Sequence, residues 1–188
     1  MAENVTREPE PTKLPRQGLV TVFTGDGKGK TTAAIGTAIR AAGYGLRVFI
    51  VFFLKGKMFS QGEALALERF PNIKTASFGA DNWIKKSAVD AQARTQAVKA
   101  IQASRKAMAG GEYDLVIMDE VNGAVDFGLI PAEDVVGVLK AKPQDVDLIL
   151  TGRHADSRII EMADVVTEMV NVKHAFERGI KAREGIDY

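Results

Sequence analysis

One segment constrains the fold of this chain more than any other, a run of glycines and lysines between a strand-like and a helix-like sequence. This segment, Val22–Thr32, reads VFTGDGKGKTT. Glycines let successive backbone N–H groups point at an anion, and the start of a helix adds the positive end of its dipole. Lys30 supplies a point charge and Thr31 offers a hydroxyl to a divalent cation. The order of strand, loop and helix predicts a phosphate-binding loop rather than a glycine-rich surface turn.

The loop is one residue tighter than the usual G-x-x-x-x-G-K-[ST] pattern, because Gly25 to Thr31 reads G-x-x-x-G-K-T. Lys28 adds a second cation within the loop. We expect the whole loop to bind a nucleotide, with Lys30 and Thr31 in catalytic roles. The predicted binding residues are Gly25, Asp26, Gly27, Lys28, Gly29, Lys30, Thr31 and Thr32.

A second segment, Leu115–Glu120, reads LVIMDE and has the form of a Walker B element, an apolar strand that ends in carboxylates. Carboxylates at the carboxyl end of a parallel strand lie at the sheet edge where open α/β folds bind ligands. Such a pair can also be a simple polar exit from the core, but beside Lys30 and Thr31 a metal role is the better interpretation. The predicted ligands of Mg²⁺ or Mn²⁺ are Thr31, Asp119 and Glu120, with Glu120 also expected to be catalytic.

Other basic residues follow predicted strands. Arg153 comes two residues after an apolar run that ends at Thr151, so it either reaches a phosphate from the same edge or is a solvated surface arginine. Lys55 and Lys57 follow another strand and are interpreted in the same way. We expect His154 to lie at the surface, or to contact a metal-binding residue, rather than to bind a metal itself, because no suitable partner lies at a metal-binding spacing.

Strand-length apolar runs alternate with helical patterns along the chain, which predicts an α/β fold with a mostly parallel sheet flanked by helices, the RecA-like architecture of P-loop NTPases. A helix is expected from Thr31 to Gly43, and another after an S-x-x-D capping box at Ser87 and Asp90, ending near Gly110. Pro131 is expected at the first position of a third helix. The predicted strands are Leu19–Thr24, Val48–Phe53, Ile73–Phe78, Leu115–Met118, Val146–Thr151 and Val165–Met169.

Composition limits the remaining possibilities. The 188 residues carry 25 Lys and Arg against 24 Asp and Glu, which argues against binding nucleic acid or a membrane by bulk charge. The chain has no cysteine and two histidines, which excludes disulfides and thiolate metal sites within it. Residues 1–17 are predicted to be a flexible arm and residues 18–188 a single domain. The start lacks the pattern of a signal peptide, so a cytoplasmic protein is expected.

Several segments together resemble the ATP:corrinoid adenosyltransferases of the CobA/BtuR/CobO type. The resemblance runs from about Gly18 to Tyr188 and includes the shortened loop and the C-terminal tail. The segments are TGDGKGKTTAA at 24–34, Lys55-Gly56 followed by Gly62-Glu63, LVIMDE at 115–120, LTGRHA at 150–155 and VKHAFERGIKAREGIDY at 172–188.

The resemblance implies that a corrinoid reduced to Co(I) attacks the 5′ carbon of ATP and expels triphosphate, in adenosylcobalamin biosynthesis or salvage. Lys28, Lys30 and a cation held by Thr31 and Glu120 would stabilise the leaving group. A flavoprotein reductant and a homodimer are expected from the resemblance. It also suggests an apolar face for the corrinoid, for which Trp83 and Phe78 are the candidates, although Trp83 is equally explained as core packing.

Other functions are compatible with the motifs. Glu120 stands where ATPases of this broad class keep a water-activating carboxylate, so a P-loop ATPase or kinase is the main alternative. A non-catalytic module that uses ATP to order a surface is another. The sequence leaves the roles of two further segments undecided. The tail either contacts the substrate or another subunit, or docks on the sheet. The N-terminal arm could close over the site through Arg16.

Overall fold

The computed structural model describes residues 16–55, 62–79 and 89–186. Within them six strands form one parallel sheet in the order β3-β2-β4-β5-β1-β6, which confirms the predicted fold class. Each predicted strand end agrees with the structure to within one residue. The strands are β1 Val20–Thr24, β2 Val48–Phe53, β3 Ile73–Phe78, β4 Leu115–Asp119, β5 Asp147–Thr151 and β6 Val165–Glu168.

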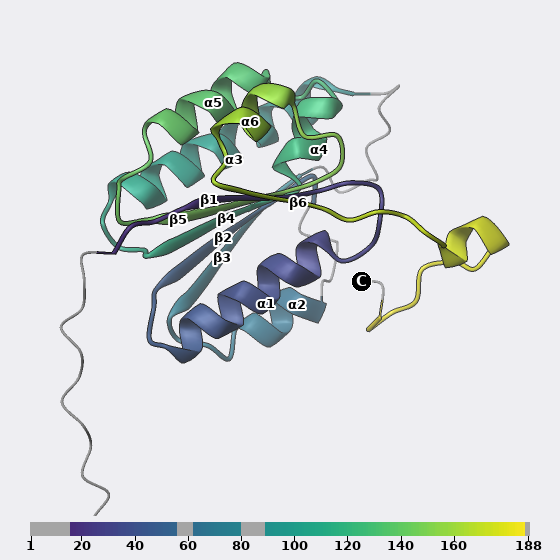
Figure 1. Ribbon diagram of the computed structural model, residues 1–188, viewed down its shortest axis with the longest axis horizontal. Coiled ribbons are helices and arrows are strands. Elements are labelled where there is room, and N and C mark those ends of the chain that lie inside the picture. The colour runs from purple at the N-terminus through teal and green to yellow at the C-terminus, as the bar shows by residue number, and fades with distance from the viewer. Residues whose placement is uncertain (1–15, 56–61, 80–88, 187–188) are drawn as a thin grey trace, which may run out of the picture.

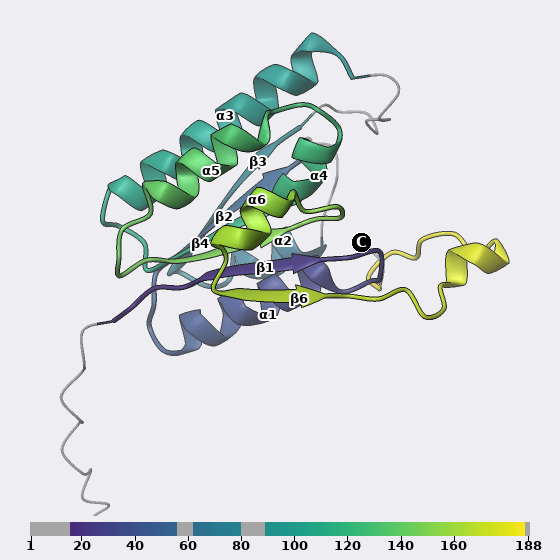
Figure 2. The ribbon, with the colours of Figure 1, turned by 45° about the horizontal axis from the view of Figure 1, so that its top comes forward.

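Helices cover both faces of the sheet (Figure 1, Figure 2). One face is covered by α1 (Lys30–Gly43) and α2 (Gly62–Leu67). The other face is covered by α3 (Ala91–Ala109), α4 (Val121–Asp126), α5 (Ala132–Lys140) and α6 (Ser157–Met162). A single 3₁₀ turn, η1 (Ala175–Arg178), follows β6. Among the described helices, none is both long and apolar enough to cross a membrane.

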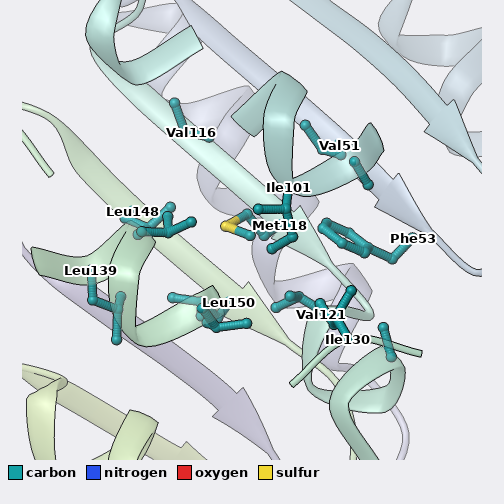
Figure 3. Packing of buried hydrophobic residues seen from close by; sticks show 14 of the residues in the cluster. Val51, Phe53, Ile101, Val116, Met118, Val121, Ile130, Leu139, Leu148 and Leu150 are labelled. Atoms are coloured by element: carbon teal, nitrogen blue, oxygen red, sulfur yellow. The ribbon is translucent and has the colours of Figure 1, made fainter. Parts of the chain in front are cut away.

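The central strands are apolar on both faces because helices bury both. All five residues of β4 are buried, and so are the last four of β2. Toward α3 and α5, large side chains fill the layer, among them Ile101 and Met118 (Figure 3). Toward α1 the layer contains Ala34 and Ala38 against Ile50 and other strand residues, so that small residues let this helix approach the sheet closely.

Two predicted helix starts compare differently with the structure. The helix α3 begins directly after the predicted capping box, and its N-cap is Asp90, which accepts a hydrogen bond from the Ala93 N–H at 2.7 Å. Ser87, the predicted cap, lies outside the described residues. Pro131 has an extended backbone and stands just before α5 rather than at its first position. The end predicted for α3, near Gly110, is confirmed.

The strand order brings three loops to one edge of the sheet. β5 pairs with β1 on one side and with β4 on the other, as Val22 opposite Leu150 and Ile117 opposite Ile149 show. The loops that follow β1, β4 and β5 therefore leave the sheet next to one another, at its carboxyl edge, where open α/β sheets bind ligands.

Arg16 lies at the opposite edge of the sheet. Its guanidinium forms an ion pair with Asp147, the first residue of β5. Arg16 is therefore not at the site in this structure, and closure by the N-terminal arm stays a prediction. The boundary between an arm and a domain stays a prediction, because residues 1–15 are not described.

Candidate active site

The phosphate loop bends at two glycines and rests on the end of β6. Gly25 and Gly29 have φ angles of 92° and 116°, in the region that side chains other than glycine rarely adopt. Gly27 donates a backbone hydrogen bond of 2.6 Å to the carbonyl of Met169. A Cβ at Gly27 would lie 2.6 Å from that oxygen and 2.7 Å from the carbonyl oxygen of Val170. The loop therefore requires glycine here because neighbouring backbone occupies the space.

Lys30 turns back into its own loop. Its Nζ donates to the carbonyl oxygens of Gly25 at 2.7 Å and Gly27 at 2.6 Å, and the residue is buried. Burial lowers the pKa of this ammonium group below its usual value. The two carbonyls hold the charge at the concave side of the loop, where the sequence predicts that it meets a phosphate.

Asp119 joins the loop to the acidic strand. Its carboxylate is completely buried at the end of β4. Its Oδ1 accepts hydrogen bonds from the hydroxyls of Thr31 at 2.8 Å and Thr151 at 2.7 Å, while its Oδ2 lies 2.9 Å from Nζ of Lys55. The structure thus brings together the hydroxyl and the carboxylate that the sequence predicts as metal ligands.

Glu120 follows in an unusual backbone conformation. Its φ of 62° and ψ of 20° are left-handed, and it caps the start of α4. Its N–H donates to Oγ1 of Thr151 at 2.9 Å. Burial is the largest cause that raises the pKa of the Glu120 carboxyl, with Asp119 next, while Lys55 and other cations partly oppose this. Because of this conformation, Asp119 and Glu120 both lie at the same edge of the sheet, but only the Asp119 side chain is fully buried.

These oxygen atoms suit a hard divalent cation. Two carboxylates and one hydroxyl, from Thr31, Asp119 and Glu120, are the donors that Mg²⁺ and Mn²⁺ accept. Nowhere in the described ranges, this edge included, is a group of three or more His, Cys, Asp or Glu side chains arranged to hold a metal ion, so a cation here would depend on the Thr31 hydroxyl as well as on the carboxylates.

The segment after β5 packs against the phosphate loop. Nε of Arg153 and Nε2 of His154 lie 3.9 Å and 3.7 Å from Oδ1 of Asp26, and Nδ1 of His154 lies 3.2 Å from Oδ2 of Asp126. The Ala155 N–H donates to Oγ1 of Thr24 at 3.2 Å. Arg153 therefore lies beside the loop with most of its side chain exposed, so the role of this arginine stays a prediction, and His154 lies between two carboxylates at the surface.

The tail returns to the loop instead of covering the sheet. After β6 the chain projects beyond the sheet and turns back (Figure 1, Figure 2). There Nζ of Lys28 donates to the carbonyl oxygen of Ile186 at 3.0 Å. Several apolar side chains of this tail are exposed, including Val172 and Phe176. Of the two predictions for the tail, docking on the sheet is wrong.

Other predicted site residues do not lie beside the phosphate loop. Phe78 ends β3, at the outer edge of the sheet, and packs partly buried against the core. Trp83 and Lys57 lie outside the described residues. Thr32 is exposed in the first turn of α1.

The site contains one residue that the sequence analysis named only as the end of a strand. Thr151 is a buried threonine whose hydroxyl contacts both acidic residues. The only signal for it is a polar residue at the end of an apolar strand, directly before Gly152. Lys55 was noted as a possible phosphate contact, yet its partner here is Asp119.

A model of the family ATP:corrinoid adenosyltransferase BtuR/CobO/CobP matches residues 16–188. The chain belongs to this family. Corrinoid adenosyltransferase from Escherichia coli (strain K12) is 39% identical over 176 residues, covering 92% of this chain and 86% of the relative. Corrinoid adenosyltransferase CobA from Salmonella typhimurium is 39% identical over 173 residues with the same coverage. A corrinoid adenosyltransferase of Pseudomonas aeruginosa is 34% identical over 172 residues, covering 92% and 84%. Membership in the corrinoid adenosyltransferase family confirms the resemblance and makes this chain a transferase.

Proposed function

We propose that this chain transfers the 5′-deoxyadenosyl group of ATP to the Co(I) centre of a reduced corrinoid and releases triphosphate. The observation that carries the proposal is the 2.8 Å contact between Thr31 and Asp119, which joins the phosphate loop to the acidic strand in a chain of this family. The product would serve adenosylcobalamin biosynthesis or salvage.

The phosphate loop would bind the leaving group. A triphosphate carries several negative charges, and its departure is eased by fixed positive groups that need no rearrangement at the moment of reaction. Loop N–H groups, Lys30 and Lys28 supply such charge, and Arg153 lies beside Asp26 within reach of the same loop. On binding, the Lys30 ammonium would exchange two carbonyl partners for phosphate oxygens.

The oxygen donors at the end of β4 would hold Mg²⁺ or Mn²⁺. Thr31, Asp119 and Glu120 fit such a cation by their chemistry. When bound, the cation supplies charge neutralisation on the triphosphate oxygens. Thr151 orients the pair by donating to Asp119 and accepting from the backbone of Glu120.

The reaction itself requires no general base, because Co(I) is already a nucleophile. The two histidines have other contacts. His154 lies between Asp26 and Asp126, and Nδ1 of His174 accepts a hydrogen bond from the Phe176 N–H.

Further parts of the proposal depend on the resemblance alone. Phe78 and Trp83 are proposed to form an apolar face for the corrinoid. A flavoprotein reductant and a homodimer are proposed on the same ground. A cytoplasmic location, expected from the sequence rather than from the resemblance, is proposed as well.

Hydrolysis or transfer of the γ-phosphoryl group is the second candidate function. It is favoured by one observation, the partly buried Glu120 directly after Asp119, where an attacking water or acceptor hydroxyl could be bound. The two functions differ in their products, so a single incubation separates them.

The test is an anaerobic incubation in the dark of the purified protein with ATP, Mg²⁺ and a chemically reduced Co(I) corrinoid. We expect a light-sensitive adenosylcorrinoid with an equal amount of triphosphate. Lys30→Ala should abolish both products, whereas Lys140→Ala, at the end of α5, should retain them. An unchanged corrinoid together with released orthophosphate would contradict the proposal and support an ATPase.

A further inference from the structure

Asp119 is a buried carboxylate that forms an ion pair with one ammonium group of the described residues, that of Lys55. The carboxylate has no solvent-exposed surface, while the side chain of Lys55 is 24% exposed, with Nζ and Oδ2 2.9 Å apart. A carboxylate buried in this way is stable only when it is hydrogen-bonded and its charge is compensated. Lys55 provides the direct ion pair, and the Lys30 ammonium acts on the same carboxylate from a greater distance.

The fold fixes Lys55 over this carboxylate from the neighbouring strand. Phe52 of β2 is paired directly with Asp119 of β4, and Lys55 follows three residues later. Leu54 between them has a left-handed φ of 61°, which turns the chain at the end of the strand. Nζ of Lys55 lies 5.1 Å from the centre of the Phe52 ring, a favourable position for a cation.

The Lys55 ammonium and a divalent cation would compete for the Asp119 carboxylate. In the described part of the chain, the side-chain groups bound to the Asp119 carboxylate all donate to it, two hydroxyls at Oδ1 and the ammonium at Oδ2. A cation bound to the Asp119 carboxylate would meet the Lys55 charge at close range, and like charges that close repel strongly. Lys55 must therefore leave Asp119, or weaken its contact, for the cation to bind.

We propose that Lys55 occupies the Asp119 carboxylate as a counter-ion in the nucleotide-free enzyme and passes to the triphosphate when nucleotide and cation enter together. The inference rests on the proposed function, since it assumes a triphosphate at the loop. Its consequence is that the cation binds weakly alone and tightly with the polyphosphate.

Charge balance explains this coupling. With no ligand, Lys55 pairs with Asp119. With both ligands, the cation pairs with Asp119 and the triphosphate pairs with Lys55. The cation alone would leave the ammonium beside a metal ion with no anion to receive it. Because coupling between two binding sites is reciprocal, the factor by which triphosphate tightens cation binding equals the factor by which the cation tightens triphosphate binding.

The experiment measures Mn²⁺ binding to the nucleotide-free protein through the loss of the electron paramagnetic resonance signal of the free aqua ion. Lys55→Met keeps the length and apolar stem of the side chain but removes its charge, and it should bind Mn²⁺ alone at least about tenfold more tightly than wild type. Lys55→Arg keeps the charge and should bind Mn²⁺ as weakly as wild type. Lys140→Met removes an exposed lysine at the end of α5 and serves as the matched control.

A double-mutant cycle assigns the effect to Asp119. In an Asp119→Asn background, Lys55→Met should give no gain in Mn²⁺ affinity, because the carboxylate that the lysine blocks is absent. With inorganic triphosphate added, and with the Mn²⁺ complex that forms without protein subtracted, triphosphate should tighten Mn²⁺ binding by a smaller factor in Lys55→Met than in wild type.

The proposal is overturned if folded Lys55→Met binds Mn²⁺ alone no more tightly than wild type, or if the gain persists in the Asp119→Asn background. Circular dichroism and the melting temperature establish folding, and Lys55→Gln replaces Lys55→Met if the methionine variant does not fold. Neither corrinoid nor adenosyl transfer enters these measurements. Failure here therefore leaves the proposed function standing, and failure of adenosyl transfer leaves this result unaffected.

Discussion

Thr151 offers the sharpest test of how the site is built, because one hydroxyl connects two acidic residues. It donates to Oδ1 of Asp119 at 2.7 Å and accepts from the N–H of Glu120 at 2.9 Å, with no exposed surface. Thr151→Val keeps the shape of the side chain and removes only the hydroxyl. The substitution therefore leaves the buried carboxylate with one donor fewer and the Glu120 N–H without this partner.

The expected loss of stability follows from these two bonds. A hydrogen bond to a charged group contributes about 1.5–3 kcal/mol, and leaving a buried donor unsatisfied costs about 1–3 kcal/mol. We expect Thr151→Val to lower the free energy of unfolding by about 3–5 kcal/mol. The left-handed backbone of Glu120, itself costing about 1–2 kcal/mol for a residue with a side chain, would lose the bond that helps to maintain it.

The assay is urea-induced unfolding followed by circular dichroism, with Thr151→Ser as the matched control that keeps the hydroxyl. The serine variant should lose no more than about 1.5 kcal/mol, mainly from the deleted methyl group. Adenosyl transfer should fall about 10–100-fold in the valine variant, as is typical when the partner of a ligand-holding group is removed. A valine variant within about 0.5 kcal/mol of wild type would show that the Thr151 hydroxyl does not stabilise the two acidic residues.

Two further outcomes are expected. Gly27→Ala should lower the free energy of unfolding in urea by about 2–4 kcal/mol, since its Cβ would lie 2.6 Å from the Met169 carbonyl oxygen. Gly36→Ala, with nothing within 4 Å of its Cβ, should instead raise it by about 0.5–1 kcal/mol by stabilising helix α1. Equal effects of the two substitutions would contradict this. Hydrogen bonds from Arg158 lower the pKa of Asp156 from 3.8 to about 2, so the stability that this carboxylate contributes is present above about pH 4 and is lost as the pH falls toward 2. At pH 6 the free energy of unfolding of wild type should therefore exceed that of Asp156→Asn by roughly 1 kcal/mol or less, and this difference should disappear at pH 2. Urea unfolding midpoints measured across this pH range test it. A difference that does not change with pH would rule out the ion pair as its source.

Much of the fold could be predicted because its signals are local. Strands buried on both faces are continuous apolar runs, and LVIMD of β4 leaves little choice of structure. The loop between β1 and α1 is likewise specified by glycines whose backbone requirements show in the sequence. Asp119 could be predicted as a site residue because it ends such a run at the edge where parallel strands point.

The short helices could not be predicted, because neighbouring elements rather than local pattern stabilise them. α4 spans only six residues, too few to form a stable helix alone, and it begins at a glutamate in a left-handed conformation. Its position depends on Gly152, where a Cβ would lie 2.7 Å from the backbone nitrogen of Gly123. No single segment of sequence contains that contact.

The hydrogen-bond and ion-pair partners of the site's side chains could not be predicted either. Lys55 was correctly noted at the end of a strand, yet sequence alone could not show that a carboxylate from β4 would be its partner. The same holds for Thr151, whose two hydrogen bonds depend on the order of strands in the sheet. Partners of this kind are set by which strands lie side by side, which local patterns leave open.

The position of β1 in the sheet has a consequence for synthesis of the chain. β1 is made early, yet both of its neighbours, β5 and β6, are made late, beginning at residues 147 and 165. The loop contact with Met169 is made later still. During translation, the phosphate loop cannot reach its final shape until the chain has been made at least as far as Met169. An incomplete chain is thereby kept from binding nucleotide in the folded manner.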